Sequence, residues 1–185
     1  MLVCAGKSES LLGVRSIGVG LVQSAISLTR LCLLERPAEL IFIGSAGAYS
    51  KETPLLSFFK SQEAYQIEQS FAQGRSYTPL DNCLEVQSAL FESIILPSAK
   101  VNSSNYIHTD CAFAQQMQNA GILLENMEFF SVLSVGQAFQ IPSMGVFCVS
   151  NYVGPHAHQE FADHHAQVKT QLNAWSQTFV ENNLK

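Results

Sequence analysis

Short apolar segments alternate with helical patterns along this chain, and that order most constrains its fold. Residues 40–43 read Leu-Ile-Phe-Ile, residues 14–19 form another strand candidate, and an apolar helical pattern at 21–34 separates the two. Continuously apolar strands need cover on both faces, which is typical of a parallel sheet between helices. The chain is therefore predicted to be an α/β protein with ligand-binding loops at the carboxyl ends of its parallel strands.

The same patterns predict the remaining elements. Apolar periodicity of 3.6 residues indicates helices, and short apolar runs bounded by turn residues indicate strands. Proline interrupts the middle of the chain repeatedly, and we expect its two strands to extend the sheet in antiparallel fashion. The predicted strands are 2–5, 55–59, 89–96 and 144–149, and the predicted helices are 110–119, 128–139 and 158–180.

Composition sets limits on the class of protein. A chain of 185 residues is long enough to bury a substantial core, and we expect one domain, residues 1–185. Charged residues make up only 14%, which favours a subunit interface that covers apolar surface, as in a homodimer or larger homo-oligomer. The net charge of −5 and the scattered Lys and Arg residues argue against nucleic acid as a partner.

Cysteine usage and hydropathy predict the compartment. The five cysteines form no CxxC pair and are odd in number, which is typical of reduced thiols in a cytoplasmic protein. The N-terminal apolar run is too short for a signal peptide, and no segment has about 18 uninterrupted apolar residues. We therefore expect no association with a membrane.

Two glycine-containing segments are candidates for contact with a ligand. The segment 44–47 reads Gly-Ser-Ala-Gly and follows the strand 40–43 directly. Small residues allow either a tight turn or a close approach of backbone to ligand, with the hydroxyl of Ser45 available. Gly18 and Gly20 precede a helix, where they either cradle an anion or permit close packing of strand and helix.

Three other features carry polar or aromatic side chains. Tyr106, in a polar stretch, is either a half-buried tyrosine or a ring that stacks on a flat ligand. Glu128 begins a helix, where the helix dipole favours a carboxylate; its two oxygens also suit neighbouring sugar hydroxyls. The segment 156–165 holds four histidines, which form either a solvated helix face or a metal site that includes His158 and His165. The spacing matches no zinc motif, and no metal is predicted.

The segments GSAGA, NMEFF and VSN occur in an order and at spacings that resemble the nucleoside phosphorylase superfamily. Within it, the chain is most similar to the purine nucleoside phosphorylases and the methylthioadenosine/S-adenosylhomocysteine nucleosidases. The resemblance implies a three-layer α/β/α fold with a central mixed, partly barrel-like sheet. It also implies a purine nucleoside as the small-molecule partner, no cofactor, and phosphate as a possible co-substrate.

The resemblance implies roles for individual residues. Glu128 matches the glutamate that binds the ribose hydroxyls, Met127 packs on the nucleoside, and Tyr106 lies against the purine. Glu9 matches the carboxylate that activates water, and Asn151 stands where an aspartate protonates the departing base. The other implied substrate contacts are Ser45, Ala46, Gly47, Asn126 and Ser150, and the implied phosphate contacts are Gly18 and Ser45.

Two departures from the family pattern bear on the chemistry. An asparagine cannot give up a proton as an acid does, but it can hydrogen-bond a ring nitrogen and a carbonyl together, which favours 6-oxopurines at Asn151. Arginines that hold phosphate in the phosphorylases are missing before the Gly-Ser segment, and Phe147 stands near an arginine position of the nucleosidases.

These observations leave two main hypotheses. The first is an enzyme that cleaves the N-glycosidic bond of a purine nucleoside with phosphate or water as the nucleophile. The second is a catalytically degenerate protein of the same fold that binds nucleosides or serves as a scaffold. A metal-dependent enzyme that uses the histidine segment is the third hypothesis.

Overall fold

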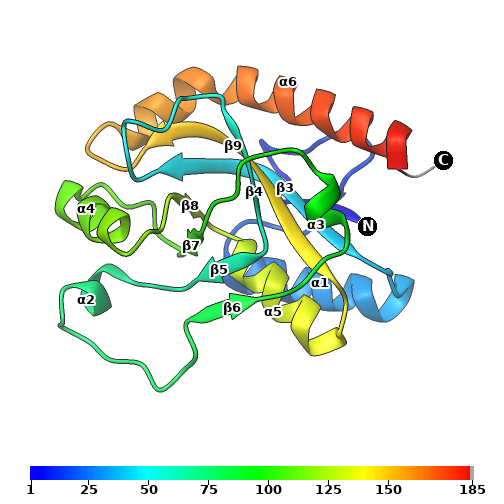
Figure 1. The fold of residues 1–185 in the computed structure, drawn as a ribbon, viewed down its shortest axis with the longest axis horizontal. Helices are drawn as coiled ribbons and strands as arrows, with labels where there is room; N and C mark the ends of the chain where they lie inside the picture. Colours follow the sequence, from blue (N-terminus) through cyan, green and yellow to red (C-terminus); the bar gives the residue numbers. More distant parts are fainter. Residues whose placement is uncertain (184–185) are drawn as a thin grey trace.

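The computed structural model describes residues 1–183, in which a mixed sheet lies between helices (Figure 1). The strands are β1 (Leu2–Cys4), β2 (Arg15–Ser16), β3 (Leu40–Ala48), β4 (Phe58–Ser61), β5 (Glu63–Tyr65), β6 (Cys83–Glu85), β7 (Val101–Ser103), β8 (Leu124–Asn126) and β9 (Ser143–Tyr152). The helices are α1 (Leu21–Glu35), α2 (Gln69–Ala72), α3 (Leu90–Ser93), α4 (Cys111–Asn119), α5 (Phe129–Phe139) and α6 (Ala157–Asn183). This arrangement confirms the predicted α/β class with a central mixed sheet.

Strand β3 is the centre of the sheet. It pairs in parallel with β1 near its start and with β9 along its whole length, and in antiparallel fashion with β8 near its end. From β8 the sheet continues through β7 and β5 to β6, while β4 joins the free edge of β9. The first half of β3 therefore lies in the core, and its last residues lie where the two parts of the sheet meet.

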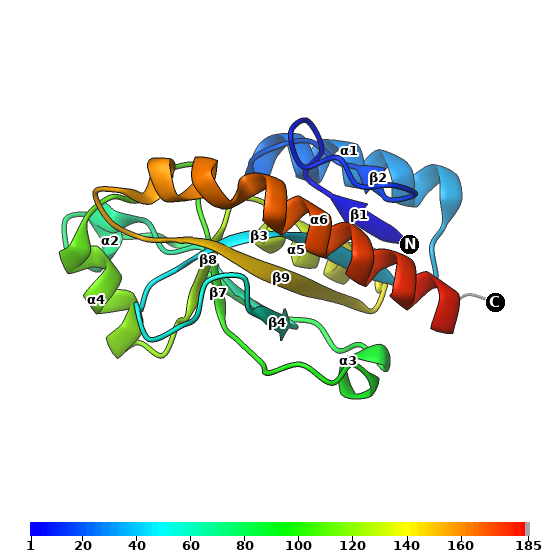
Figure 2. The same cartoon turned by 90° about the horizontal axis from the view of Figure 1, so that it is seen from above.

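Alternation along β3 explains the layers. Ile41 and Ile43 pack with the apolar face of α6, whereas Leu40 and Phe42 pack with α1 and α5 on the opposite face. Figures 1 and 2 show α6 lying along one side of the sheet and α1 on the other. The run Leu-Ile-Phe-Ile thus divides its side chains between two cores, as period-two alternation requires.

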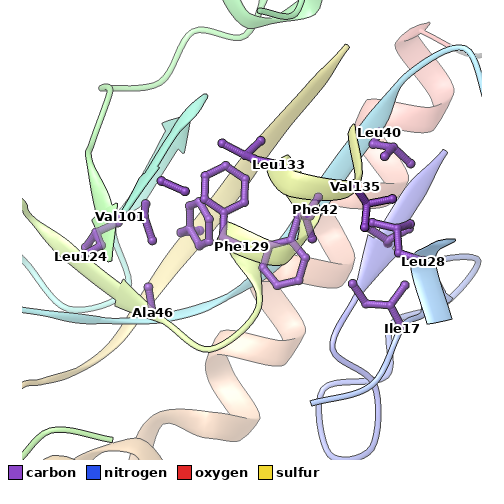
Figure 3. Close-up of a cluster of buried hydrophobic side chains, with 14 of the residues drawn as sticks. Ile17, Leu28, Leu40, Phe42, Ala46, Val101, Leu124, Phe129, Leu133 and Val135 are labelled. Atoms are coloured by element: carbon purple, nitrogen blue, oxygen red, sulfur yellow. The ribbon is translucent and has the colours of Figure 1, made fainter. Parts of the chain in front are cut away.

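Three aromatic rings fill the core between β3, β9 and α5. The ring centroids of Phe147 lie 5.8 Å from Phe42 and 5.0 Å from Phe129, and all three side chains are fully buried. Figure 3 shows Phe42 and Phe129 among the aliphatic side chains of this cluster. Phe147 is therefore a core residue, and its position offers nothing to an anion.

Several predicted boundaries differ from the structure. The segment 89–96 was expected to be a strand but contains the short helix α3, because Phe91 and Ile94 meet the core at a spacing of three residues. The strand predicted at 55–59 begins only at Phe58, after a turn in which Leu56 has φ of 64°. The other predicted strands and long helices are present within a few residues of their expected ends.

The segment 44–47 is not a tight turn. Strand β3 continues through it to Ala48, because its backbone is paired with β9 on one side and, from Gly47, with β8 on the other. Within residues 1–183, no helix combines the length and hydropathy needed to cross a membrane.

The aromatic cluster generates a prediction about Gly145 of β9. A Cβ atom there would lie 2.6 Å from the ring of Phe147 and 2.7 Å from that of Phe129. We expect Gly145→Ala to lower the free energy of unfolding by about 1–3 kcal/mol through overpacking. Urea unfolding measures this change. Gly154→Ala is the matched control, because its Cβ would meet only Cys111 Sγ, at 3.7 Å; equal stability of the two variants would contradict the packing argument.

Candidate active site

A cavity of about 240 Å³ lies beside the last residues of β3 and β9. The loop after β1, the turn before α1, the β8–α5 junction and the start of α6 complete its wall. This is the edge at which parallel strands were expected to present ligand-binding residues.

Glu128 is a buried carboxylate in this wall. Its Oε1 accepts a hydrogen bond from the backbone N–H of Gly20 at 2.9 Å, and the residue is only 3% exposed. Burial is the main cause that raises the pKa of Glu128 to about 7; the Gly20 hydrogen bond opposes the shift and the nearby charge of Glu9 adds to it. The Gly18–Gly20 turn thus serves to fix Glu128.

Asn126 caps helix α5 and thereby positions Glu128. Its Oδ1 accepts the backbone N–H groups of Glu128 and Phe129 at 2.8 and 2.9 Å, and its Nδ2 donates to the carbonyl of Ser45 at 3.0 Å. The side chain of Glu128 makes no capping bond of its own. Its carboxylate is therefore directed to the cavity and the Gly20 amide.

Glu9 and Ser45 form a second polar pair. The hydroxyl of Ser45 donates to Glu9 Oε1, and the Ser45 backbone N–H lies 3.4 Å from Glu9 Oε2. Glu9 is held in the loop after β1 by its own N–H, which donates to the carbonyl of Gly6 at 3.0 Å. Both side chains line the cavity together with Glu128.

A β-bulge turns Asn151 toward the cavity. Val149 pairs with Ala46 but Asn151 pairs with Gly47, which leaves Ser150 as the extra residue of β9. The hydroxyl of Ser150 donates to Asn151 Oδ1 at 2.7 Å, and Asn151 Nδ2 donates to the carbonyl of Tyr152 at 3.3 Å. Because Nδ2 has a second hydrogen, the amide retains a donor for a ligand.

Most of the predicted site residues line this cavity. The structure brings together Glu9, Ser45, Ala46, Gly47, Asn126, Met127, Glu128, Ser150 and Asn151. Two predicted residues are not brought to it. Tyr106 is 71% exposed and its neighbour Ile107 lines the wall instead, and Gly18 faces the side chain of Gln23 while Val19 takes the place beside the cavity.

Sequence reasoning missed three side chains of the wall. Phe161 and His158 reach it from the first turns of α6, and Glu125 reaches it from β8. Phe161 lies in the helix predicted at 158–180, and only the position of that helix start beside β9 brings the ring to the cavity. Glu125 precedes the Asn126–Glu128 segment and carried no signal of its own.

The histidine segment does not form a metal centre. In the part of the chain that the structure describes, no three His, Cys, Asp or Glu side chains are grouped as metal ligands. His156 is exposed, the Nδ1 of His164 lies 2.7 Å from the Glu160 carbonyl, and the Nε2 of His165 lies 3.1 Å from the Ser8 carbonyl. All five cysteines are free thiols, as expected, and none of them lines the cavity.

The cavity is anionic. Three carboxylates line it, those of Glu9, Glu125 and Glu128, whereas within residues 1–183 no lysine or arginine does. Arg15 pairs with Glu35 at 3.0 Å on the surface, and the other three arginines, Arg30, Arg36 and Arg75, are exposed. A phosphate ion would therefore meet repulsion in this cavity without a compensating cation.

Solved structures with the same architecture are numerous. A mutant 5'-methylthioadenosine/S-adenosylhomocysteine nucleosidase of Helicobacter pylori, with 5'-methylthioadenosine in its active site, superposes with a TM-score of 0.82 at 16% identity, over 98% of this chain and 97% of that one. Futalosine hydrolase of the same organism gives 0.82 at 16% identity, over 98% and 96%. The nucleosidase of Streptococcus pneumoniae gives 0.75 at 15% identity, over 92% and 94%.

The chain has the nucleoside phosphorylase/nucleosidase fold. No protein-family model and no curated protein matches the sequence. The fold resemblance expected from GSAGA, NMEFF and VSN is therefore confirmed by three-dimensional similarity over nearly the whole chain, at low sequence identity.

Burial of Glu128 generates a prediction about stability and pH. Its folded-state pKa of about 7 exceeds the ordinary value of 4.5, and the folded protein therefore holds the proton more tightly than the unfolded chain. The free energy of unfolding should fall as pH rises through this window, by roughly 3 kcal/mol in total. Glu128→Gln should lose this fall, as measured by urea unfolding at about pH 5 and about pH 8.

The exposed carboxylate of Glu52 supplies the control for that measurement. Glu52→Gln should keep the pH dependence of the wild-type protein. An identical pH dependence in wild type and Glu128→Gln would show that Glu128 is ionised in the fold without cost, contrary to this account.

Proposed function

We propose that this protein hydrolyses the N-glycosidic bond of a purine nucleoside. The observation that carries the proposal is a cavity in which three carboxyl groups and an amide converge and which no lysine or arginine of residues 1–183 lines. Bond cleavage places positive charge on the sugar and negative charge on the base. Carboxylates stabilise the first, and an amide N–H stabilises the second.

Glu128 supports the sugar end of this proposal. A carboxylate has two acceptor oxygens, and one of them is already held by Gly20 N–H at 2.9 Å. The remaining lone pairs are free to accept hydrogen bonds from neighbouring ribose hydroxyls. A substrate that donates such bonds also lowers the cost of ionising Glu128 in its buried position.

Glu9 and Ser45 support water as the nucleophile. Glu9 is partly exposed at the cavity, and Ser45 holds its carboxylate through both hydroxyl and backbone N–H. A carboxylate fixed in this way is suited to accept a proton from an attacking water molecule. Phosphorolysis is not favoured, because phosphate would approach three acidic side chains, those of Glu9, Glu125 and Glu128, without an arginine beside them.

The relatives in fold support the same reaction class. Two of the proteins that superpose on this chain are named nucleosidases, one of them with 5'-methylthioadenosine in its active site, and another is named a hydrolase of futalosine. In the proposed reaction the water molecule is the only co-substrate, and no cofactor takes part. Asn151 would hydrogen-bond the departing base, and its donor and acceptor atoms favour a 6-oxopurine.

The test is release of free base from inosine, guanosine and 5'-methylthioadenosine. We expect release from at least one of them, and a loss of about 100-fold or more in kcat for Glu9→Gln, because the general base is removed. Base release is followed by chromatography, with Glu52→Gln as the surface control. Absence of release from all three at high enzyme concentration would exclude this function.

A second candidate is a nucleoside-binding protein without turnover, and Asn151 is the residue that favours it. Asn151→Asp supplies a proton donor beside Ser150 and should raise kcat by about 100- to 10,000-fold if the wild type is a slow enzyme. Steady-state kinetics of the variant decide between the candidates. Activity that appears only in Asn151→Asp supports the binding protein, and an unchanged kcat contradicts the role given to Asn151.

We also propose that a second copy of the chain covers helix α1. Val22, Ile26 and Leu33 are each more than 60% exposed and lie on one side of this helix, away from α5. Apolar surface of this kind is typical of subunit interfaces. Sedimentation velocity should therefore give a dimer or larger species, and Ile26→Glu should shift it toward the monomer. A wild-type monomer at all concentrations would contradict this.

A further inference from the structure

A second buried carboxylate lies on the same face of the sheet as Asn151. Strand pairing places Glu125 of β8 opposite Gly47 of β3, and Gly47 opposite Asn151 of β9. Residues paired across strands share a face, and Glu125 and Asn151 therefore flank Gly47 with their backbones about 10 Å apart. Gly47 has no side chain, and the amide of Asn151 lies over it, with Nδ2 3.1 Å from where a Cβ atom of residue 47 would stand.

His108 and Tyr49 hold the carboxylate of Glu125. Its Oε1 accepts the backbone N–H of His108 at 3.2 Å, and its Oε2 lies 2.5 Å from His108 Nδ1 and accepts the Tyr49 hydroxyl at 3.1 Å. Burial, together with the charge of Glu125, raises the pKa of Tyr49 well above its usual range, which keeps this hydroxyl a donor. Asn102 in turn donates to the Tyr49 oxygen at 3.1 Å.

Burying the Glu125 carboxylate and its hydrogen-bond partners costs free energy of folding, and an apolar side chain at this position would avoid that cost. Glu125 is 7% exposed and His108 is 5% exposed, and a desolvated carboxylate needs such partners to remain in the fold. Three donors occupy three of its roughly four lone-pair sites. An acceptor site therefore remains on a carboxylate that lines the cavity.

The distance between Ser45 and Gly47 along β3 places Glu125 near the base of a bound nucleoside, away from the sugar. Ser45, which holds Glu9, lies two residues before Gly47, which corresponds to about 7 Å along the strand. A nucleoside with its sugar at Ser45 and Glu128 therefore extends its base toward Gly47 and the Asn151 amide that lies over it. The base then has Asn151 on one side and Glu125 on the other.

We propose that Glu125 is a specificity-determining residue that accepts a hydrogen bond from N1–H of a 6-oxopurine. The proposal rests on the proposed nucleoside site and deepens it. A 6-oxopurine presents the acceptor O6 next to the donor N1–H, which complements the donor of Asn151 and the acceptor of Glu125. Adenine presents a donor at position 6 and a lone pair at N1, which would face the Glu125 carboxylate without a hydrogen bond.

The test measures binding of free bases, which needs no turnover. Isothermal titration calorimetry should give a Kd for hypoxanthine at least about tenfold below those for adenine and for 1-methylhypoxanthine, in which a methyl group replaces the N1 hydrogen. The methylated base tests the wild-type protein itself. Equal or tighter binding of adenine or of 1-methylhypoxanthine overturns the proposal, and so does the absence of binding by all three bases.

Glu125→Gln tests the residue directly. An amide of the same size keeps an acceptor for His108 and offers a donor to N1 of adenine, and the ratio of the two Kd values should move toward adenine by about tenfold or more. Glu68→Gln is the matched control, because Glu68 is a half-buried carboxylate, hydrogen-bonded by Ser104 at 3.1 Å, that does not line the cavity. An unchanged ratio in folded Glu125→Gln overturns the proposal.

Base binding tests the role of Glu125 and base release tests hydrolysis, and the two measurements can give opposite results. A protein that hydrolyses a nucleoside but does not prefer hypoxanthine keeps the proposed function and loses the role of Glu125. A protein that prefers hypoxanthine and releases no base from any nucleoside keeps the role of Glu125 and loses hydrolysis.

Discussion

The site depends on how the last residues of β3 pair with β9. A single bulge, in which Ser150 is the extra residue, shifts the register between Ala46 and Gly47. Without the bulge, Asn151 would continue the alternation of Phe147 and Val149 and would face the core under α5. With the bulge, Asn151 lies on the same sheet face as Ser45 and Gly47 of β3. Ser45, beside Glu9, and Gly47, beside Asn151, thus lie two residues apart on one strand and line the same cavity.

Burial of charge is the second constraint. Glu128 and Glu125 are almost completely removed from water, and each is held by backbone N–H groups, hydroxyls or an imidazole. No lysine or arginine among the described residues lines the same cavity. Such a cavity stabilises developing positive charge, as on a sugar that loses its base, and it repels phosphate. This imbalance of charge favours water over phosphate as the nucleophile.

The sequence predicted the elements whose pattern is local. The continuous apolar run Leu40–Ile43 predicts a strand buried on both faces, and the apolar patterns of α1, α5 and α6 predict helices; these elements were found within a few residues of their expected bounds. The short strands β5 to β8 were not predicted, because three-residue strands are defined by their partners rather than by a pattern. The helix α3 was mistaken for a strand for a related reason: its four residues are too few for a period.

The candidate site was predictable where its residues belong to short sequence motifs. Glu9, Ser45, Met127, Glu128 and Asn151 line one cavity as their motifs implied. Tyr106 does not, because the loop presents Ile107 instead, and no sequence pattern fixes which residue of an irregular loop turns inward. Phe161 and Glu125 became visible only when α6 and β8 were placed beside β3.

The dependence of turnover on phosphate tests the central claim most directly. Base release from the preferred nucleoside is measured with phosphate absent and with phosphate in excess, and the sugar product is identified. An anionic cavity with Glu9 as the base for water predicts equal rates and free sugar in both conditions. Release that requires phosphate and yields a sugar phosphate would contradict the account.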